Sequence, residues 1–283
     1  MLPLSFRILL RRLGSRSDLS SWHDHLKVMF AVMRFEKLMR SLDTPSPVGK
    51  GEMTAIVLSY KRPQNMDAIV RSLLATPSVG TVIVSNNNPE ISIEKWIMIQ
   101  DSRLRILNQK EHRCTPERMH IASRCPGELF LTVDDDLFLR PDQYEIVCTA
   151  LRSDPTRVHG MFGTDCTSDG SFLTIRTGDR DVDILNRIYG FSQTHVSAFA
   201  ALVKSLRSSG ISVPENDNTW DDIILSFSGT GRPRSHHIGC YLDCPTQGTR
   251  HIAVWREDGF FEKRRKLYGT LLGMDMRQVH RNA

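Results

Sequence analysis

Two acidic clusters are the residues best suited to carry chemistry. Asp134, Asp135 and Asp136 directly follow the apolar run at 129–133. Neighbouring carboxylates raise one another's pKa, and a divalent cation removes that repulsion. Hard oxygen ligands suit Mn²⁺ or Mg²⁺, which commonly bridge to substrate phosphates. The alternative is a helix cap or a turn built by one of the three, but the position after a buried strand favours metal.

The second cluster is the pair Asp221 and Asp222, which precedes the apolar residues 223–225. Paired carboxylates can divide catalytic work, because one can orient a substrate hydroxyl while the other stabilises positive charge or accepts a proton. The alternative is that both carboxylates only compensate the dipole of a following helix.

Basic residues at 263–266, with Arg264 among them, could clamp a diphosphate through bidentate guanidinium contacts. A solvated helix face is the alternative. Sparse aromatic residues nearby argue against nucleic acid as a partner.

A zinc site built from His236, His237, Cys240 and Cys244 is a weaker hypothesis, because the spacing is not that of a standard knuckle and no second cysteine pair follows. The sequence contains no GxxxxGK[ST], HExxH or GxSxG motif, and no GxGxxG follows the first strand. P-loop nucleotide hydrolysis and these forms of zinc peptidase and serine hydrolase chemistry are therefore excluded.

The elements that must position these residues read as an α/β fold. Short apolar runs alternate with helix-like stretches, which is typical of a mostly parallel sheet covered on both faces. Strands are expected at 54–59, 81–84, 104–107 and 129–133, with helices at 65–74, at 91–99 and after Thr115, the expected N-cap before Pro116. Beyond residue 151 the alternation weakens, with strands expected within 160–176 and helices at 197–207 and 220–227.

Ligands of such sheets bind beyond the carboxyl ends of the strands. Tyr60 and Arg62 follow the first expected strand, and Asn86 and Asn87 follow the second. These residues are therefore expected at the same edge as the first acidic cluster.

The chain has 283 residues, of which 40% are hydrophobic and 24% are charged, so it can bury a substantial core. We expect a helical N-terminal extension and linker at 1–52, a first half of the globular domain at 53–152, and a second half at 153–283. The net charge of +5 slightly favours polyanionic partners. No apolar run reaches the length of a membrane span, but the basic, apolar segment at 4–13 could contact a membrane surface or pack on the domain.

Taken in order, several motifs resemble the exostosin-type glycosyltransferases of family 64. The resemblance spans about residues 54–268 and rests on these segments: 55–62, 82–87, Arg118-Met119, 131–136 and 220–223. It implies a GT-A fold, with a nucleotide-sugar-binding half and an acceptor-binding half. It also implies retaining transfer of an N-acetylhexosamine or another hexose from a UDP-sugar, with Mn²⁺ or Mg²⁺, to a glycan, glycolipid or glycoprotein.

The resemblance also assigns roles to single residues. Asp136 is the expected metal ligand, with Asp134 beside it, and Asp222 with Asp221 lies on the catalytic face. The residues expected at the nucleotide sugar are Tyr60, Arg62, Asn86, Asn87, Arg118, Asp134, Asp135 and Arg264. If the chain is like its eukaryotic relatives, its compartment is the endoplasmic reticulum or the Golgi.

Two departures from the family pattern affect the expected specificity. Glu117 stands where the family has Asn, and Thr219-Trp220 precede the Asp pair where the family has Asn-Cys. Two other functions remain open: a binding module that holds a nucleotide sugar or an acidic glycan without turnover, and an inverting transferase of the family-two type that uses an aspartate as general base.

Overall fold

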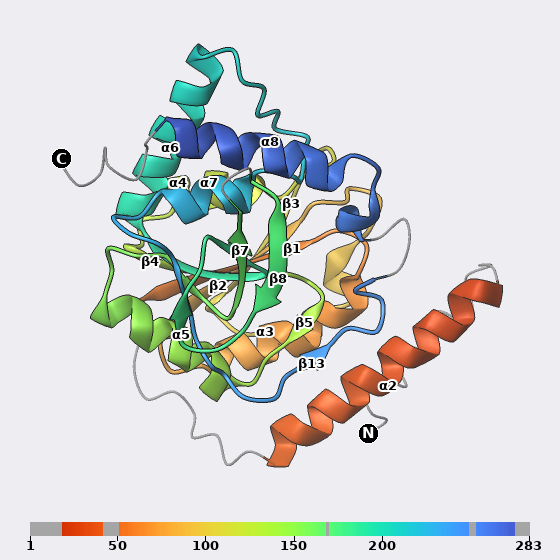
Figure 1. The fold of residues 1–283 in the computed structure, drawn as a ribbon. Coiled ribbons are helices and arrows are strands. Elements are labelled where there is room, and N and C mark those ends of the chain that lie inside the picture. The colour runs from red at the N-terminus through yellow and green to blue at the C-terminus, as the bar shows by residue number, and fades with distance from the viewer. Residues whose placement is uncertain (1–18, 42–50, 168–169, 249–252, 275–283) are drawn as a thin grey trace.

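A computed structural model of the chain describes residues 19–41, 51–167, 170–248 and 253–274 (Figure 1). The segment at 4–13 and the Pro- and Gly-containing run at 43–49 lie outside the described residues. Within the described ranges, no helix is both long and apolar enough to cross a bilayer.

The centre of the molecule is an eight-stranded sheet with the order β3-β2-β1-β4-β11-β6-β12-β9. The first four strands are mutually parallel, whereas β11 is antiparallel to both β4 and β6. The strand bounds, in that order, are Leu104–Asn108, Val79–Asn86, Met53–Ser59, Leu129–Val133, Ile188–Ser192, His159–Gly160, Arg234–Ser235 and Arg180–Asp181. This arrangement confirms the expected α/β, GT-A-like fold with a largely parallel sheet.

Two smaller sheets complete the strand pattern. β10 (Ile184–Asn186), β7 (Phe162–Cys166) and β8 (Phe172–Arg176) form one, and β13 (Leu242–Asp243) pairs with β5 (Leu137–Phe138) in the other. Because β5 begins directly after the Asp134–Asp136 cluster, β13 lies beside that cluster.

Apolar side chains alternate between the two faces of the central strands. On one face, Val57 and Leu131 pack with three helices: α2 (Leu19–Ser41), α3 (Met66–Leu74) and α5 (Pro141–Ser153). The ring of Phe35 on α2 lies 5.4 Å from that of Phe138, which ties the N-terminal helix to the domain.

On the opposite face, Ile56 and Phe130 pack with a second group of helices. These are α4 (Glu117–Arg124), α6 (Gln193–Ser208), α7 (Asp221–Phe227) and α8 (Phe260–Gly273). Figure 1 shows this layer on one side of the sheet, with α2, α3 and α5 on the other. The burial of both faces explains why the central strands read as continuous apolar runs.

The predicted helix at 91–99 is wrong. Only a 3₁₀ turn, η2 (Ile93–Lys95), forms there. The buried carboxylate of Asp67 accepts the backbone N–H groups of Met98 and Ile99, so these groups bond to a side chain instead of to a helix. The other helix and strand predictions within the described residues are confirmed, with ends that move by a few residues.

The two expected halves of the domain share one sheet. β11 comes from the second half, yet it pairs with β4 from the first half along its whole length. Core residues from both halves also pack together, among them Val133 and Ile188. The described residues of both expected halves therefore contribute to one core.

Candidate active site

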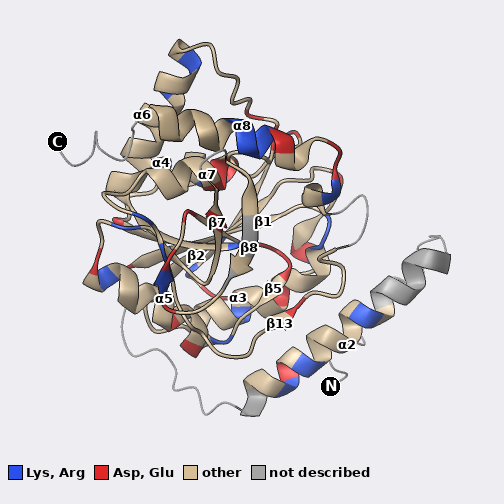
Figure 2. Cartoon of the chain, in the orientation of Figure 1, with Lys and Arg blue, Asp and Glu red and all other residues tan. Residues whose placement is uncertain are grey.

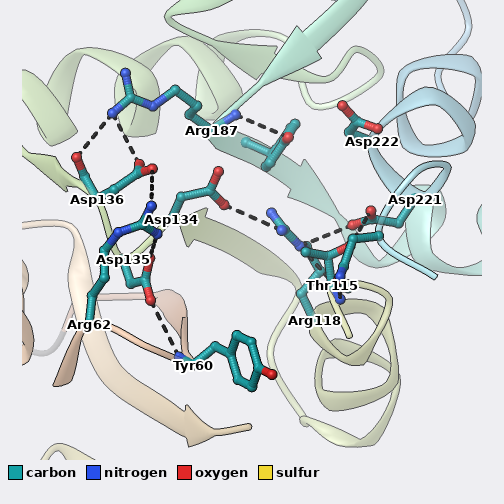
Figure 3. Close-up of polar contacts among 12 residues, drawn as sticks. Tyr60, Arg62, Thr115, Arg118, Asp134, Asp135, Asp136, Arg187, Asp221 and Asp222 are labelled. Carbon is teal, nitrogen blue, oxygen red and sulfur yellow. Dashed lines mark hydrogen bonds and ion pairs between the residues drawn. The ribbon is translucent and has the colours of Figure 1, made fainter. Parts of the chain in front are cut away.

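A buried ion pair joins the carboxyl ends of β1 and β4 (Figure 3). Nη1 of Arg62 lies 2.7 Å from Oδ1 of Asp135, and Oδ2 of Asp135 accepts the backbone N–H of Tyr60 at 3.3 Å. Asn65 donates to the backbone carbonyl of Asp135 at 2.7 Å. Burial raises the pKa of the Asp135 carboxyl, against the opposing effect of Arg62. Asp135 thus holds the ends of β1 and β4 together.

Arg118 of α4 connects the two acidic clusters. Its Nη2 lies 3.3 Å from Oδ1 of Asp134, and its Nε lies 3.1 Å from Oδ2 of Asp221. Thr115 donates its hydroxyl to Oδ1 of Asp221 at 2.6 Å. The Arg118 side chain is only 4% exposed, so water and salt screen these ion pairs weakly. Arg118 therefore fixes the end of β4 relative to the start of α7 (Figure 3).

Arg264 reaches the site from α8 and pairs with Asp222. Its Nη1 and Nη2 atoms lie 2.6 Å and 2.8 Å from the two carboxylate oxygens of Asp222. The guanidinium group also lies 5.2 Å from the ring centroids of both Phe172 and Phe260. Both members of the pair are largely buried. The structure therefore brings together the two residues that the sequence placed at the diphosphate and on the catalytic face.

A fourth arginine, Arg187, meets the cluster from the opposite direction. It stands directly before β11, whose first residue pairs with Val133, the last residue of β4. Its Nη2 lies 3.0 Å from Oδ1 of Asp136, and its Nη1 lies 2.7 Å from Oδ1 of Asp243 on β13. Arg62 also approaches Asp136, with Nη2 3.6 Å from Oδ2. Both oxygens of Asp136 therefore face guanidinium groups.

The oxygen atoms at the end of β4 suit a hard divalent cation. The Asp134 side chain is 32% exposed, and desolvation raises the pKa of its carboxyl to about 7, against the opposing charge of Arg118. In the part of the chain that the structure describes, no three His, Cys, Asp or Glu side chains converge on one point. An ion at Asp134 and Asp136 would therefore complete its shell with water or phosphate oxygens, as Mg²⁺ commonly does.

The residues expected on the nucleotide side are only partly available to a ligand. The ring of Tyr60 is half-buried and lies 4.3 Å from that of His112. Asn86 donates to the Ile91 carbonyl and to the Asn108 side chain, and Asn87 accepts the hydroxyl of Ser85. The two asparagine side chains therefore stabilise the loop after β2, while the half-buried Tyr60 ring lies against His112 and Lys61.

The basic run at 263–266 divides between two environments. Lys263, Arg265 and Lys266 are exposed on α8, whereas Arg264 is 5% exposed. Figure 2 shows basic residues on α8 near the acidic start of α7. Of the four basic residues, only Arg264 is therefore placed to contact a diphosphate. The other three form a solvated helix face, which was the alternative interpretation.

The zinc hypothesis is wrong for the residues it named. Nε2 of His236 lies 2.9 Å from Nδ1 of His159, and Cys244 is buried against Asn65 and Thr246. Cys240 is exposed. These side chains belong to no cluster of metal-binding type within the described ranges.

Sequence reasoning missed two residues of the site. Thr115 was predicted to cap α4, but that helix begins at Glu117 and the Thr115 hydroxyl bonds to Asp221. The sequence did single out Thr115, because it precedes Pro116, but it predicted a helix cap instead of a contact with the second acidic cluster. No local sequence pattern marks Arg187 as a site residue, because only the pairing of β11 with β4 brings it to Asp136.

One family model and several solved structures are similar to this chain. The sequence model described as "Glycosyl transferase family 2" matches residues 54–206, more than half of the chain. A solved structure of the mannosyltransferase PcManGT from Pyrobaculum calidifontis, in complex with GDP-Man and Mn²⁺, is similar at 15% identity, with 89% of this chain and 70% of that chain covered and a TM-score of 0.47. TarS 1-349 of S. aureus is similar at 13% identity, with 67% and 59% covered and a TM-score of 0.42. No curated protein matches.

The matched region begins in β1 and ends in α6. It therefore contains Arg62, the Asp134–Asp136 cluster and Arg187, and it ends before Asp221, Asp222 and Arg264. The resemblance to exostosin-type enzymes of family 64 is not confirmed. On the strength of the match across residues 54–206, the chain belongs to glycosyl transferase family 2.

Proposed function

We propose that this protein transfers a hexose or an N-acetylhexosamine from a UDP-sugar to a glycan, glycolipid or glycoprotein acceptor, with Mn²⁺ or Mg²⁺ as cofactor. One observation supports this proposal above the others. Ion pairs connect the ends of β1 and β4 with the starts of α4 and α7, and so gather carboxylates and guanidinium groups at the ligand-binding edge of the sheet. Such a site can hold a metal ion and a diphosphate side by side.

In this proposal the roles follow from position and charge. Asp136 and Asp134 hold the divalent cation, which when bound neutralises charge on the leaving nucleotide. Arg62 and Arg264 supply guanidinium groups to the diphosphate, because planar guanidinium groups match phosphate geometry. Tyr60 offers its ring to the base, and Asp135 and Arg118 keep the strand ends and α7 in register.

For the stereochemistry, we propose inversion, with Asp222 as general base. Family membership favours the family-two type of transferase over the retaining type expected from the exostosin resemblance. In the free protein both oxygens of Asp222 are bonded to Arg264. Asp222 can accept a proton from an acceptor hydroxyl only after Arg264 turns to the diphosphate, so binding of the sugar donor prepares the base.

Retention is the second candidate, and the same ion pair favours it. A carboxylate bonded through both oxygens to a buried guanidinium is a poor base, because the adjacent positive charge favours its ionised form. Asp221 does not replace it, because its carboxyl contacts both Thr115 and Arg118. Assignment of the product anomer by NMR separates the two candidates.

The test of the proposed function is a screen of nucleotide sugars by nucleotide release, with and without Mn²⁺. We expect UDP release with at least one UDP-sugar, a strong decrease on chelation, and a further loss in Asp136→Ala. Asp142→Ala, at an exposed carboxylate on α5, is the matched control. Absence of UDP release from every UDP-sugar would contradict the proposal, and release from a GDP-sugar alone would contradict the proposed donor.

A binding module without turnover gives a different pattern in the same experiments. Metal-dependent UDP binding by calorimetry, with neither hydrolysis nor transfer to any acceptor, would support that alternative.

We also propose a peripheral membrane contact, and we place it on the outer face of α2. Leu26, Phe30 and Met33 are exposed there, with Phe30 62% exposed, and their spacing puts them on one side of the helix. Lys27, Arg34 and Lys37 are exposed next to them. This combination of apolar and cationic side chains is suited to an anionic bilayer surface.

A further inference from the structure

Arg187 has a backbone conformation that arginine rarely adopts. It lies between β10 and β11 with φ of +68°, and it is the one residue other than glycine with positive φ in the described ranges. Asn, Asp or Gly adopt this region at lower conformational energy. Such strain persists where the surrounding contacts over-determine it, and it concentrates at functional sites.

The contacts that fix Arg187 reach two of the three aspartates in the cluster. Its backbone carbonyl accepts the N–H of Asp134 at 2.9 Å. Its Nη2 contacts both the backbone carbonyl and the carboxylate of Asp136 at 3.0 Å, and its Nη1 pairs with Asp243. The guanidinium group also lies over the ring of Phe162. Arg187 therefore orients both residues that we propose as metal ligands.

The same contacts place Arg187 in competition with a metal ion. Oδ1 of Asp136 bonds to Arg187, and Oδ2 faces Arg62. Both the Asp136 carboxylate and the Arg187 guanidinium are only 14% exposed, so the pair is screened weakly. A cation that enters alone must displace this pair. A diphosphate provides other oxygens to which a guanidinium group can turn.

We propose that Arg187 is a positioning residue that pairs with Asp136 in the free protein and thereby couples metal binding to nucleotide binding. Mn²⁺ binds weakly alone and tightly with UDP, because the diphosphate accepts the guanidinium group as Asp136 accepts the metal. This inference rests on the proposed function, since it assumes that Asp136 is a metal ligand. Coupling of this kind is reciprocal, so Mn²⁺ increases the affinity for UDP by the same factor.

The test is a titration of the full chain with Mn²⁺, followed by the EPR signal of free Mn²⁺, in the absence and presence of UDP. Arg187→Asn removes the guanidinium group and suits positive φ. We expect it to bind Mn²⁺ alone about tenfold more tightly than the wild type, and to show UDP-induced tightening that is smaller by the same factor. Arg187→Lys keeps the charge and should remain near the wild type. Arg124→Gln, at an exposed arginine, controls for net charge.

The outcomes separate this inference from the proposed function. If the wild type binds UDP with Mn²⁺ but Arg187→Asn shows unchanged or weaker affinity for Mn²⁺ alone, the inference is overturned and the function stands. If no variant binds Mn²⁺ or UDP, both are overturned. Thermal melts establish that each variant is folded. If Arg187→Asn does not fold, Arg187→Gly, which relieves the backbone strain, takes its place.

Discussion

At the scale of single residues, the ion pair between Asp222 and Arg264 links stability to function. Asp222→Ala leaves a buried guanidinium group without its carboxylate, and such a loss typically destabilises by about 3–5 kcal/mol. We expect the double variant Asp222→Leu with Arg264→Met to recover most of that stability in urea unfolding, because no unpaired charge remains. Both proteins should be inactive. Activity in the double variant would contradict a catalytic role for the pair.

Tyr60 gives a second prediction at this scale, because its backbone N–H bonds to Asp135 and its ring is half-buried (Figure 3). Stacking of a base on an aromatic ring contributes about 1–3 kcal/mol. Tyr60→Ala should therefore raise KM for the nucleotide sugar about tenfold with a smaller change in kcat. Tyr60→Phe keeps the ring and serves as the control. Equal KM values in all three proteins would show that the base binds elsewhere.

At the scale of secondary-structure elements, the pairing of β6 with β12 brings two histidines together, one in β6 and one directly after β12. His159 and His236 stack with ring centroids 5.2 Å apart. Burial lowers the pKa of both, that of His236 to about 4. Nε2 of His159 lies 2.8 Å from the Asp154 carbonyl, so it donates, and its Nδ1 accepts from His236. Burial between these strands therefore favours the neutral form of both rings.

This preference predicts a pH dependence of stability. Between pH 6.5 and pH 4 the unfolded chain binds a proton that the folded chain excludes from His236, so stability falls as pH falls through this window, by at most about 1.4 kcal/mol per pH unit. The lowered pKa of His159 acts in the same direction. His236→Gln should reduce the slope of melting temperature against pH, and His237→Gln at an exposed neighbour is the control. An unchanged slope in His236→Gln would contradict this explanation.

Most of the secondary-structure elements, and part of the site, could be predicted from the sequence. The parallel strands and most helices follow from local apolar patterns, as does the placement of Arg62 and Asp135 at one edge. The helix predicted at 91–99 does not form, because the carboxylate of Asp67, about thirty residues away in the sequence, accepts the backbone N–H groups of Met98 and Ile99. Arg187 could not be found because its position depends on strand pairing between segments about fifty residues apart. Local patterns carry no information on such contacts.

At the scale of the whole molecule, the membrane contact proposed for the outer face of α2 predicts a defined orientation of the protein on a bilayer. We expect the protein to float with vesicles that contain anionic lipids and less with neutral ones. Phe30→Glu should reduce flotation strongly without loss of nucleotide release. Leu107→Glu, at an exposed apolar residue of β3, is the matched control.

Two results would contradict the membrane contact. One is equal flotation of Phe30→Glu and the wild type. The other is a dimer in light scattering that Phe30→Glu dissociates, since that face would then be covered by a second copy of the chain.

The most direct test of the central claim is a crystal structure with UDP and Mn²⁺, with the ion located by anomalous scattering. The account predicts that the anomalous peak places the ion in contact with Asp136 and the diphosphate, and that Arg264 has turned from Asp222 to the phosphate oxygens. A diphosphate bound away from the Asp134–Asp136 cluster, or an ion held elsewhere, would contradict it.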